Sequence, residues 1–245
     1  MSRAALSALI IGNEVLTAKV TEANGAHLIR RCRERGVELD SIHFVRDDVD
    51  AIVEQVHACR CRARWLVTSG GVGPTHDDVT VRAVALALQR PVIQLPEMVA
   101  RITAWYGDRP VPAEALRMSE APAGATLVAS EDVRFPVLEC DGIFMLPGVP
   151  SLFRVQFDAV VEKLPRTPVT LRQLYLDAAE ADIAAALDAI ARAKPHVAIG
   201  SYPTWDDAAD HRVKLTIEHP DARETTAVLE ELKRTLPKGA VIRED

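Results

Sequence analysis

Aromatic residues are scarce in this chain of 245 residues, where they make up only 4% of the sequence. Alanine, valine, leucine and isoleucine therefore supply most of the apolar content, which reaches 48%. This bias favours helices packed on a parallel sheet, because the buried strands of such sheets are rich in valine, isoleucine and leucine. The length suits one large domain, or a domain of roughly 160 residues followed by a small one.

Long apolar runs and an excess of positive charge are also missing. No run approaches the roughly 18 residues of a membrane-spanning helix. The net charge is −6, so we expect neither a membrane nor a nucleic acid as partner. The short apolar stretch that ends at Ile11 runs directly into Gly12-Asn13-Glu14, without the small-residue cleavage site of a signal peptide. We interpret this stretch as a first strand and expect a cytoplasmic protein.

Cysteines are few, at four, and their spacing fits no metal site. Cys59 and Cys61 are two residues apart, and no second pair of cysteine or histidine residues lies at zinc spacing. Cys32 and Cys140 stand alone. We expect each cysteine to be a small core residue or a free thiol.

Strand-like and helix-like segments alternate through the first two thirds of the chain. The expected strands are 7–11, 37–45, 65–68, 126–129, 136–139 and 143–146, and the expected helices are 21–35, 48–61, 78–89, 96–105, 112–119 and 151–164. This alternation predicts a three-layer α/β/α fold with a mainly parallel sheet. Ligands of such folds bind beyond the carboxyl ends of the strands.

Two prolines, Pro165 and Pro168, indicate a boundary between a domain at 1–166 and a small domain at 167–245. Beyond them the expected strands are 169–176, 197–202, 212–218 and 241–243, and the expected helices are 179–193 and 222–236. This order, β-α-β-β-α-β, is the split βαβ pattern of a small α+β domain.

A glycine-rich loop runs from Ser69 to Asp78 between an expected strand and an expected helix. Gly70, Gly71 and Gly73 let the backbone bend and leave room for a ligand. Backbone N–H groups in such a turn, next to a helix N-terminus, favour anions, and Thr75 adds a hydroxyl donor. The loop lacks the lysine of a Walker A motif. We expect it to hold a phosphate group.

Two adjacent carboxylates, Asp77 and Asp78, close this loop. Carboxylates beside a phosphate site would repel the ligand unless a cation lies between them, and Mg²⁺ binds carboxylates together with phosphate oxygens. We therefore expect Mg²⁺ or another divalent metal at Asp77 and Asp78. The alternative is that Asp78 caps the following helix, because aspartate is a favoured N-cap residue.

Other polar residues follow the expected strands and belong to the same edge of the sheet. Gly12 and Glu14 end the first strand, Asn24 lies near the start of the next helix, and Asp47 follows the second strand. A second strand-to-helix loop, Pro147-Gly148-Val149-Pro150, forms the far wall of the same cleft if its strand neighbours the glycine loop. Taken one by one, these are ordinary turn and cap residues.

Three motifs in order resemble the molybdopterin-binding domain of the MoaB/Mog type, over about 8–164. They are Gly12-Asn13-Glu14 with Asn24, the glycine loop with Asp78, and Leu146 to Pro150. The sequence Pro-Thr-His-Asp-Asp-Val-Thr in the glycine loop most resembles one branch of this family. That branch contains the CinA N-terminal domain and the molybdopterin-binding-like domain of eukaryotic FAD synthase. The tail Gly200-Ser201-Tyr202-Pro203 resembles the small domain of FAD synthases.

The resemblance implies a small-molecule nucleotide or pterin ligand, a homo-oligomer (dimer or trimer), and a choice of activities. One is a metal-dependent pyrophosphatase acting on FAD or ADP-ribose. The alternatives are molybdopterin binding or adenylylation, in which the functional aspartates correspond to Asp47 and Asp78, and a non-catalytic binding module. Many CinA proteins have glutamate after Pro-Ser in the second loop, where this chain has Leu152, so that role is not transferred.

Asp77 and Asp78 are expected to be catalytic and to bind the metal. The residues expected to bind the substrate are Gly12, Glu14, Asn24, Asp47, Ser69, Gly70, Gly71, Gly73, Thr75, Pro147, Gly148 and Pro150.

Overall fold

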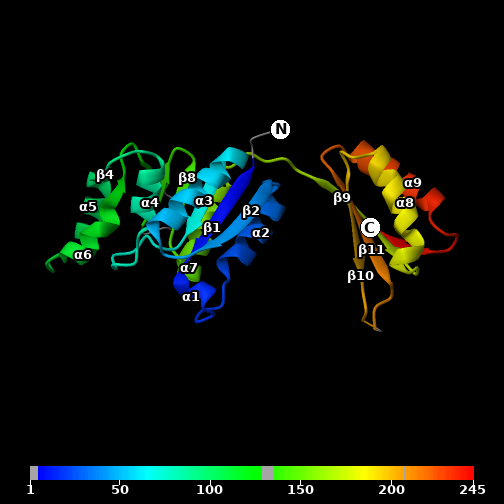
Figure 1. Ribbon diagram of the computed structural model, residues 1–245, viewed down its shortest axis with the longest axis horizontal. Helices are drawn as coiled ribbons and strands as arrows, with labels where there is room; N and C mark the ends of the chain where they lie inside the picture. The colour runs from blue at the N-terminus through cyan, green and yellow to red at the C-terminus, as the bar shows by residue number, and fades with distance from the viewer. Residues whose placement is uncertain (1–4, 129–134, 207) are drawn as a thin grey trace. The chain divides into compact units, whose positions relative to one another are not determined.

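The computed structural model describes residues 5–128, 135–206 and 208–245, and the chain divides into two compact units (Figure 1). Unit 1 covers Met1–Arg166 and unit 2 covers Thr167–Asp245. Each unit has a hydrophobic core of its own. Within the described ranges, no helix is long and apolar enough to cross a membrane.

Unit 1 is built on a six-stranded sheet. Its strands, in spatial order, are β2 (Leu39–Val45), β1 (Leu6–Ile11), β3 (Trp65–Ser69), β8 (Ile143–Leu146), β7 (Val137–Cys140) and β6 (Thr126–Val128). The pairs β2–β1, β1–β3 and β3–β8 are parallel, whereas β8–β7 and β7–β6 are antiparallel. The predicted mainly parallel sheet is confirmed. Ala129, the last residue of one predicted strand, lies outside the described residues.

Helices cover both faces of this sheet, which confirms the three layers. One hydrophobic cluster contains residues of the helices α2 (Asn24–Arg35) and α7 (Pro150–Val161). A second cluster contains residues of the helices α3 (Val49–Arg62) and α4 (Thr80–Ala87). The first cluster contains Leu28, Phe157 and Val67, and the second contains Ile52 and Leu66. Adjacent residues of β3 enter different clusters because successive side chains of a strand point to opposite faces.

Local capping decides where two of these helices begin. At α3, the Asp48 carboxylate accepts a hydrogen bond from the backbone N–H three residues on, at 2.9 Å, as expected of an N-cap aspartate. The helix predicted over 21–35 begins later, at Asn24. There the carboxylate of Glu22 accepts a hydrogen bond from the backbone N–H of Gly25 at 2.7 Å, which satisfies one of the free N–H groups in the first turn of the helix.

The stretch between α4 and β6 differs from the prediction. It contains β4 (Val92–Gln94), α5 (Pro96–Tyr106), α6 (Ala113–Leu116), a 3₁₀ turn η1 (Arg117–Ser119) and β5 (Glu120–Pro122). The two strands form a small antiparallel sheet that the sequence did not indicate, and the helix predicted over 112–119 is divided between α6 and η1. Strands of three residues carry too little alternation to be recognised, and their pairing is non-local.

Unit 2 is a four-stranded antiparallel sheet with two helices. In chain order its elements are β9 (Thr170–Leu176), α8 (Glu180–Ala193), β10 (Ala198–Pro203), β11 (Val213–His219), α9 (Ala222–Thr235) and β12 (Val241–Glu244). This order confirms the split βαβ pattern. Leu174 and Leu215 of the sheet pack with Ile183 of α8 and Leu232 of α9.

Candidate functional site

Parallel strands bring three loops to one edge of the sheet in unit 1. Ser69 at the end of β3 is paired with Ile10 of β1 on one side and with Leu146 of β8 on the other. The chain continues from these positions into the loop at Gly12, the glycine loop, and the loop Pro147 to Pro150. The predicted neighbourhood of the two strand-to-helix loops is therefore present.

Two glycines are required by the packing of the glycine loop itself. Gly70 has φ 109°, and a Cβ there would lie 2.2 Å from the carbonyl oxygen of Ile11. Gly71 has φ 67°, and a Cβ there would lie 2.3 Å from the hydroxyl of Thr80, which donates to the carbonyl of Gly70 at 2.8 Å. The sequence suggested that these glycines leave room for a ligand. Their first effect is to let the loop close against β1 and α4.

A hydroxyl and two carboxylates meet at the tip of this loop. Thr75 Oγ1 lies 2.6 Å from Asp77 Oδ1 and 2.5 Å from Asp78 Oδ2, and the Thr75 backbone N–H donates to Asp78 Oδ2 at 2.8 Å. A hydroxyl carries one proton, so it satisfies one carboxylate at a time. The hydrogen bond from Thr75 holds the pKa of Asp77 below its usual value, which keeps this carboxyl ionised at neutral pH. Two negative charges therefore converge on one atom.

Asp78 is not the cap of the next helix, so that alternative is wrong. The helix predicted to open at Asp78 begins at Thr80, its N-cap residue is Val79, and no side chain caps it. The carboxylate of Asp78 turns back into the loop, where a Cβ on Gly73 would lie 2.7 Å from it. The backbone N–H and the hydroxyl of Thr75 both bond this carboxylate, and they hold its orientation.

Two arginines that the sequence analysis missed join the glycine loop at a pocket of about 120 Å³. Arg82 of α4 and Arg117 of η1 line it together with Gly71, Gly73 and Asp78. Arg117 donates to the carbonyl of Pro74 at 3.3 Å, while Arg82 is exposed and has no partner in the described part of the chain. Guanidinium groups suit phosphate oxygens because their planar donors match the anion. Arg82 could have been recognised as a candidate phosphate ligand because it lies in the helix that follows the glycine loop. No local pattern indicated that Arg117 would lie at this loop.

Asn24 links α2 to the start of the glycine loop and to the loop Pro147 to Pro150. Its side-chain amide donates to Ser69 Oγ at 2.9 Å and to the carbonyl of Gly148 at 2.8 Å, across 45 and 124 residues of sequence. The residue is 5% exposed. Ser69 is thus in contact with α2 and, at 3.5 Å, with the carbonyl of Pro147. Four of the expected substrate-binding residues form one network.

The remaining acidic residues lie near this edge without a direct bond to the pair at Thr75. Asp47 accepts from the backbone N–H of Asn13 at 2.8 Å. Burial raises the pKa of Asp47 above its usual value, and the negative charges of Glu14, Asp77 and Asp78 act in the same direction. Asp47 therefore lies within electrostatic reach of the other three carboxylates, and a cation is the natural counterpart of such an edge.

The donor set at this edge fits a shared metal better than a closed protein site. Within residues 5–128, 135–206 and 208–245, no three side chains of histidine, cysteine, aspartate or glutamate converge as a metal site. Asp77 and Asp78 converge as a pair. Mg²⁺ commonly takes one or two carboxylates and completes its shell with substrate phosphates and water. The residues fit a cation that arrives with, or is completed by, a phosphate ligand.

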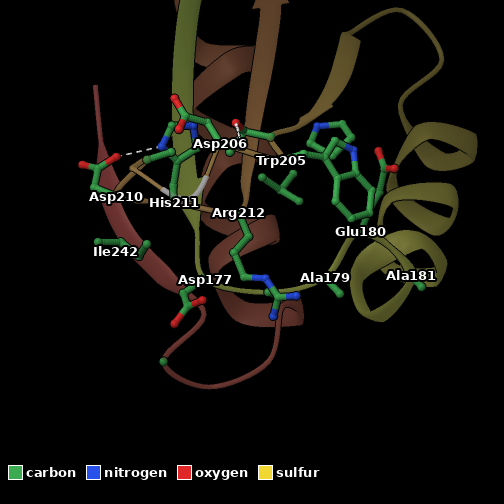
Figure 2. Close-up of a pocket in the computed structure, with 16 residues that line it drawn as sticks. Asp177, Ala179, Glu180, Ala181, Trp205, Asp206, Asp210, His211, Arg212 and Ile242 are labelled. Carbon is green, nitrogen blue, oxygen red and sulfur yellow. Dashed lines mark hydrogen bonds and ion pairs between the residues drawn. The ribbon is translucent and has the colours of Figure 1, made fainter.

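Unit 2 contains a larger pocket, of about 960 Å³, at the N-terminal end of α8 (Figure 2). Trp205 lines this pocket, and its side chain is 94% exposed. Several of its charged groups are already paired, since Asp210 lies 2.7 Å from His211 and Glu180 accepts from Ser201 at 2.6 Å. The pocket offers more space, but among its described lining residues no hydroxyl joins two carboxylates as Thr75 joins Asp77 and Asp78 in unit 1.

The four cysteines carry no part of either pocket. All are free thiols, and Cys32, Cys59 and Cys140 are buried while Cys61 is exposed. Burial raises the pKa of Cys32 to about 12, so this thiol is inert at neutral pH. The expectation of core residues or free thiols is confirmed.

Comparison with known proteins bears on both units. Residues 7–167 match the family described as "Probable molybdopterin binding domain", and residues 168–245 match the family described as "FAD synthase, middle domain". The chain is 30% identical to a "Probable FAD synthase" of Caenorhabditis briggsae, covering 93% of this chain and 49% of that protein. It is also 30% identical to a CinA-like protein of Myxococcus xanthus, with 90% and 56% covered.

Among solved structures, CinA of Thermoplasma acidophilum is similar to this chain with a TM-score of 0.60 and 25% identity. The similarity covers 65% of this chain and 98% of that chain. The resemblance inferred from the three motifs is thereby confirmed, and the chain spans about half the length of the FAD synthase and CinA-like relatives. The match over residues 7–167 shows that the chain belongs to the molybdopterin-binding domain family.

Proposed function

We propose that unit 1 is a metal-dependent pyrophosphatase that acts on an ADP-linked nucleotide such as FAD or ADP-ribose. The observation that carries this proposal is the meeting of two carboxylates, Asp77 and Asp78, at the hydroxyl of Thr75. Two ionised groups at one exposed point repel each other, and a divalent cation relieves that repulsion. The relatives named FAD synthase and CinA-like support a nucleotide as the ligand.

The residues around the pair can hold a diphosphate. Arg82 and Arg117 line the pocket beside Asp78. The backbone N–H groups of Val72 and Gly73 have no acceptor in the described part of the chain, so they are free to donate to a phosphate oxygen. Donors and guanidinium groups on one side, and carboxylates on the other, suit a phosphate group that is bridged to a cation.

Hydrolysis requires a water oxygen to attack one phosphorus atom while the bridging P–O bond breaks, which releases AMP and the second phosphate ester. A divalent cation bound at Asp77 and Asp78 would neutralise the developing charge and lower the pKa of the attacking water. The task of Arg82 and Arg117 is to orient the diphosphate. Glu14 and Asp47 add negative charge that favours binding of the cation.

The test is release of AMP from FAD and from ADP-ribose by the full chain, with Mg²⁺, with Co²⁺ and with chelator. We expect release from at least one substrate that a chelator abolishes. Absence of metal-dependent AMP release from both substrates would overturn the proposal, and binding of the nucleotides without turnover would favour a non-catalytic module.

Molybdopterin binding or adenylylation is the second candidate, and the description of the matched family favours it. Asp47 and Asp78 would then be the aspartates at the ligand. Molybdopterin that remains bound through purification of the full chain would support this candidate, whereas a ligand-free protein that releases AMP from ADP-ribose would exclude it as the main activity.

A further inference from the structure

The donors of Thr75 engage one oxygen of each carboxylate in the glycine loop. Its backbone N–H donates to Asp78 Oδ2 at 2.8 Å, and its hydroxyl lies 2.6 Å from Asp77 Oδ1 and 2.5 Å from Asp78 Oδ2. Asp78 Oδ2 keeps the N–H whichever carboxylate takes the hydroxyl proton, whereas Asp77 Oδ1 depends on the hydroxyl alone. We expected Thr75 to donate to a phosphate group, but both of its donors face the carboxylates.

The second oxygen of each carboxylate, Asp77 Oδ2 and Asp78 Oδ1, accepts no hydrogen bond from another residue in the described part of the chain. Both carboxylates can be reached from outside the protein. The side chain of Asp77 is 60% exposed, and Asp78 lines the pocket that also contains Arg82 and Arg117. A cation at this loop therefore meets one uncommitted oxygen from each aspartate.

The number of oxygens that a site offers separates Mg²⁺ from Ca²⁺. Mg²⁺ takes about six oxygens in near-octahedral geometry and keeps several waters, whereas Ca²⁺ accepts roughly six to eight and often binds a carboxylate through both oxygens. A carboxylate with one oxygen engaged by a short hydrogen bond is poorly suited to binding through both. Two single oxygens therefore suit a small cation of octahedral coordination.

We propose that Thr75 is a specificity-determining residue, which makes the aspartate pair select Mg²⁺ over Ca²⁺ by engaging one oxygen of each carboxylate. The proposal rests on the proposed function, because it assumes a divalent cation at Asp77 and Asp78. When the hydroxyl is lost, Asp77 has both oxygens to offer, while Asp78 Oδ2 still accepts the backbone N–H. The loss should therefore favour Ca²⁺ and leave the loop closed.

A hydroxyl that only braces the loop leads to a different expectation. Its loss would let the two carboxylates move apart, and the affinity for both cations would fall by the same factor. A hydroxyl that limits the oxygens on offer changes the ratio of the two affinities instead. Thr75→Val removes the hydroxyl and keeps the branched shape, and Thr75→Ser keeps the hydroxyl. Thr75 is exposed, so we expect both variants to fold.

The experiment is titration of the full chain with MgCl₂ and with CaCl₂ at constant ionic strength, followed by the NMR signals of the backbone amides of Thr75 and Gly73. This measures Kd for each metal alone, without turnover. We expect Mg²⁺ to bind the native chain and Thr75→Ser more tightly than Ca²⁺. In Thr75→Val we expect the ratio to shift towards Ca²⁺ by about fivefold or more. Thr75→Ala repeats the test if the valine variant does not fold.

Thr126 offers a matched control in the same unit. Its hydroxyl donates to Glu139 Oε2 at 2.9 Å, and Glu139 Oε1 accepts from the backbone N–H of Gly142 at 2.7 Å. Thr126 is exposed and does not line the pocket at the glycine loop. Thr126→Val should leave the ratio of the two affinities at the native value. A shift equal to that of Thr75→Val would show a general effect of losing such a hydroxyl, and would overturn the inference.

The inference and the proposed function fail separately. The role of Thr75 is overturned if neither metal binds, if Ca²⁺ binds the native chain more tightly, if Thr75→Val keeps the native ratio, or if Thr75→Ser shifts it as far as Thr75→Val does. Each of these results stands even where metal-dependent AMP release is found. A preference for Mg²⁺ that depends on the hydroxyl, without any AMP release, supports the selective site and overturns the pyrophosphatase.

Discussion

The glycine-loop edge of unit 1 and the pocket of unit 2 differ in opposite ways in space and in chemistry. The edge in unit 1 has small cavities of about 120 and 50 Å³, while the pocket in unit 2 measures about 960 Å³. Unit 1 brings together paired carboxylates and two guanidinium groups. In unit 2, charged groups such as Asp210 and Glu180 are already paired with neighbours. The meeting of two carboxylates at one hydroxyl, beside two guanidinium groups, identifies the site better than volume does.

Strand direction explains much of this difference. In unit 1, β1, β3 and β8 are parallel, so the loops that follow them all leave at one edge and residues distant in sequence meet there. In unit 2 the strands are antiparallel, so consecutive strands deliver their ends to opposite edges. Substitutions at corresponding positions of the two units should therefore have different effects.

A methyl group at Gly70 should have the largest effect. Gly70→Ala meets the carbonyl of Ile11 at a positive φ, and we expect a loss of about 3 kcal/mol in the free energy of unfolding. Gly239 in the pocket of unit 2 has φ 82° but nothing within 4 Å of a new Cβ, so Gly239→Ala should cost only about 1 kcal/mol. Urea unfolding compares the two, and equal losses would contradict the tight packing of the glycine loop.

Removal of one charge from the carboxylate pair should have the largest effect on catalysis. Asp78→Asn keeps an acceptor for the N–H of Thr75, so the loop should stay folded. We expect turnover of ADP-ribose to fall at least tenfold, or about 1.4 kcal/mol of barrier. Asp206→Asn in the pocket of unit 2 is the control and should leave turnover unchanged. A drop in melting temperature with turnover intact in Asp78→Asn would mean that the carboxylate only braces the loop.

Loss of a guanidinium group should weaken substrate binding when the arginine lies at the glycine loop, and should have no effect when it lies in the pocket of unit 2. Arg117→Ala is expected to raise KM for ADP-ribose about fivefold, or about 1 kcal/mol, because a charged hydrogen bond to the diphosphate is lost. Arg212→Ala, which removes the arginine of the unit 2 pocket, should leave KM as it is. Steady-state kinetics measure both, and the reverse pattern would move the nucleotide to unit 2.

Acid should destabilise the two units at different pH, with the smallest effects of this series. Burial lowers the pKa of His27 in α2 below its usual value of 6.5, although the carboxylate of Asp158, 3.6 Å away, acts in the opposite direction. The unfolded chain then binds the proton first, so stability contributed by neutral His27 is complete above pH 6.5 and falls as the pH drops below it.

In unit 2, Asp221 caps α9 and its hydrogen bonds with Arg223 lower its pKa from 3.8 to about 2. Its contribution is present above pH 3.8 and is lost as the pH falls towards 2. Unfolding curves between pH 7 and pH 3 should show a loss of stability below pH 6.5 that His27→Gln reduces and Asp221→Asn leaves in place. An identical acid profile in the native chain and His27→Gln would exclude the histidine as its source.

The sequence predicted the features that depend on local pattern. The alternation of strands and helices predicted the layers of unit 1 and the order of unit 2, and the helix predicted over 48–61 begins beside Asp48, which caps it. Asp78 has the same local signature and yet is no cap, because its carboxylate bonds the backbone N–H and the hydroxyl of Thr75 instead. A capping preference is a weak signal where a tight loop provides competing hydrogen bonds.

Contacts between distant segments were beyond local pattern. Asn24, Ser69 and Gly148 were each expected at the ligand, but their shared hydrogen bonds depend on the strand order. Arg117 was hidden in a stretch expected to be helical, which instead ends in a 3₁₀ turn beside the glycine loop. These residues needed the fold before their role could be inferred.

The most direct test of the central claim is the dependence of AMP release from ADP-ribose on Mg²⁺ concentration, in the native chain and in Asp78→Asn. The account predicts that chelator abolishes release and that the variant needs at least tenfold more metal for half-maximal rate. Release that is insensitive to chelator, or the same metal dependence in both chains, would contradict a cation held at Asp77 and Asp78.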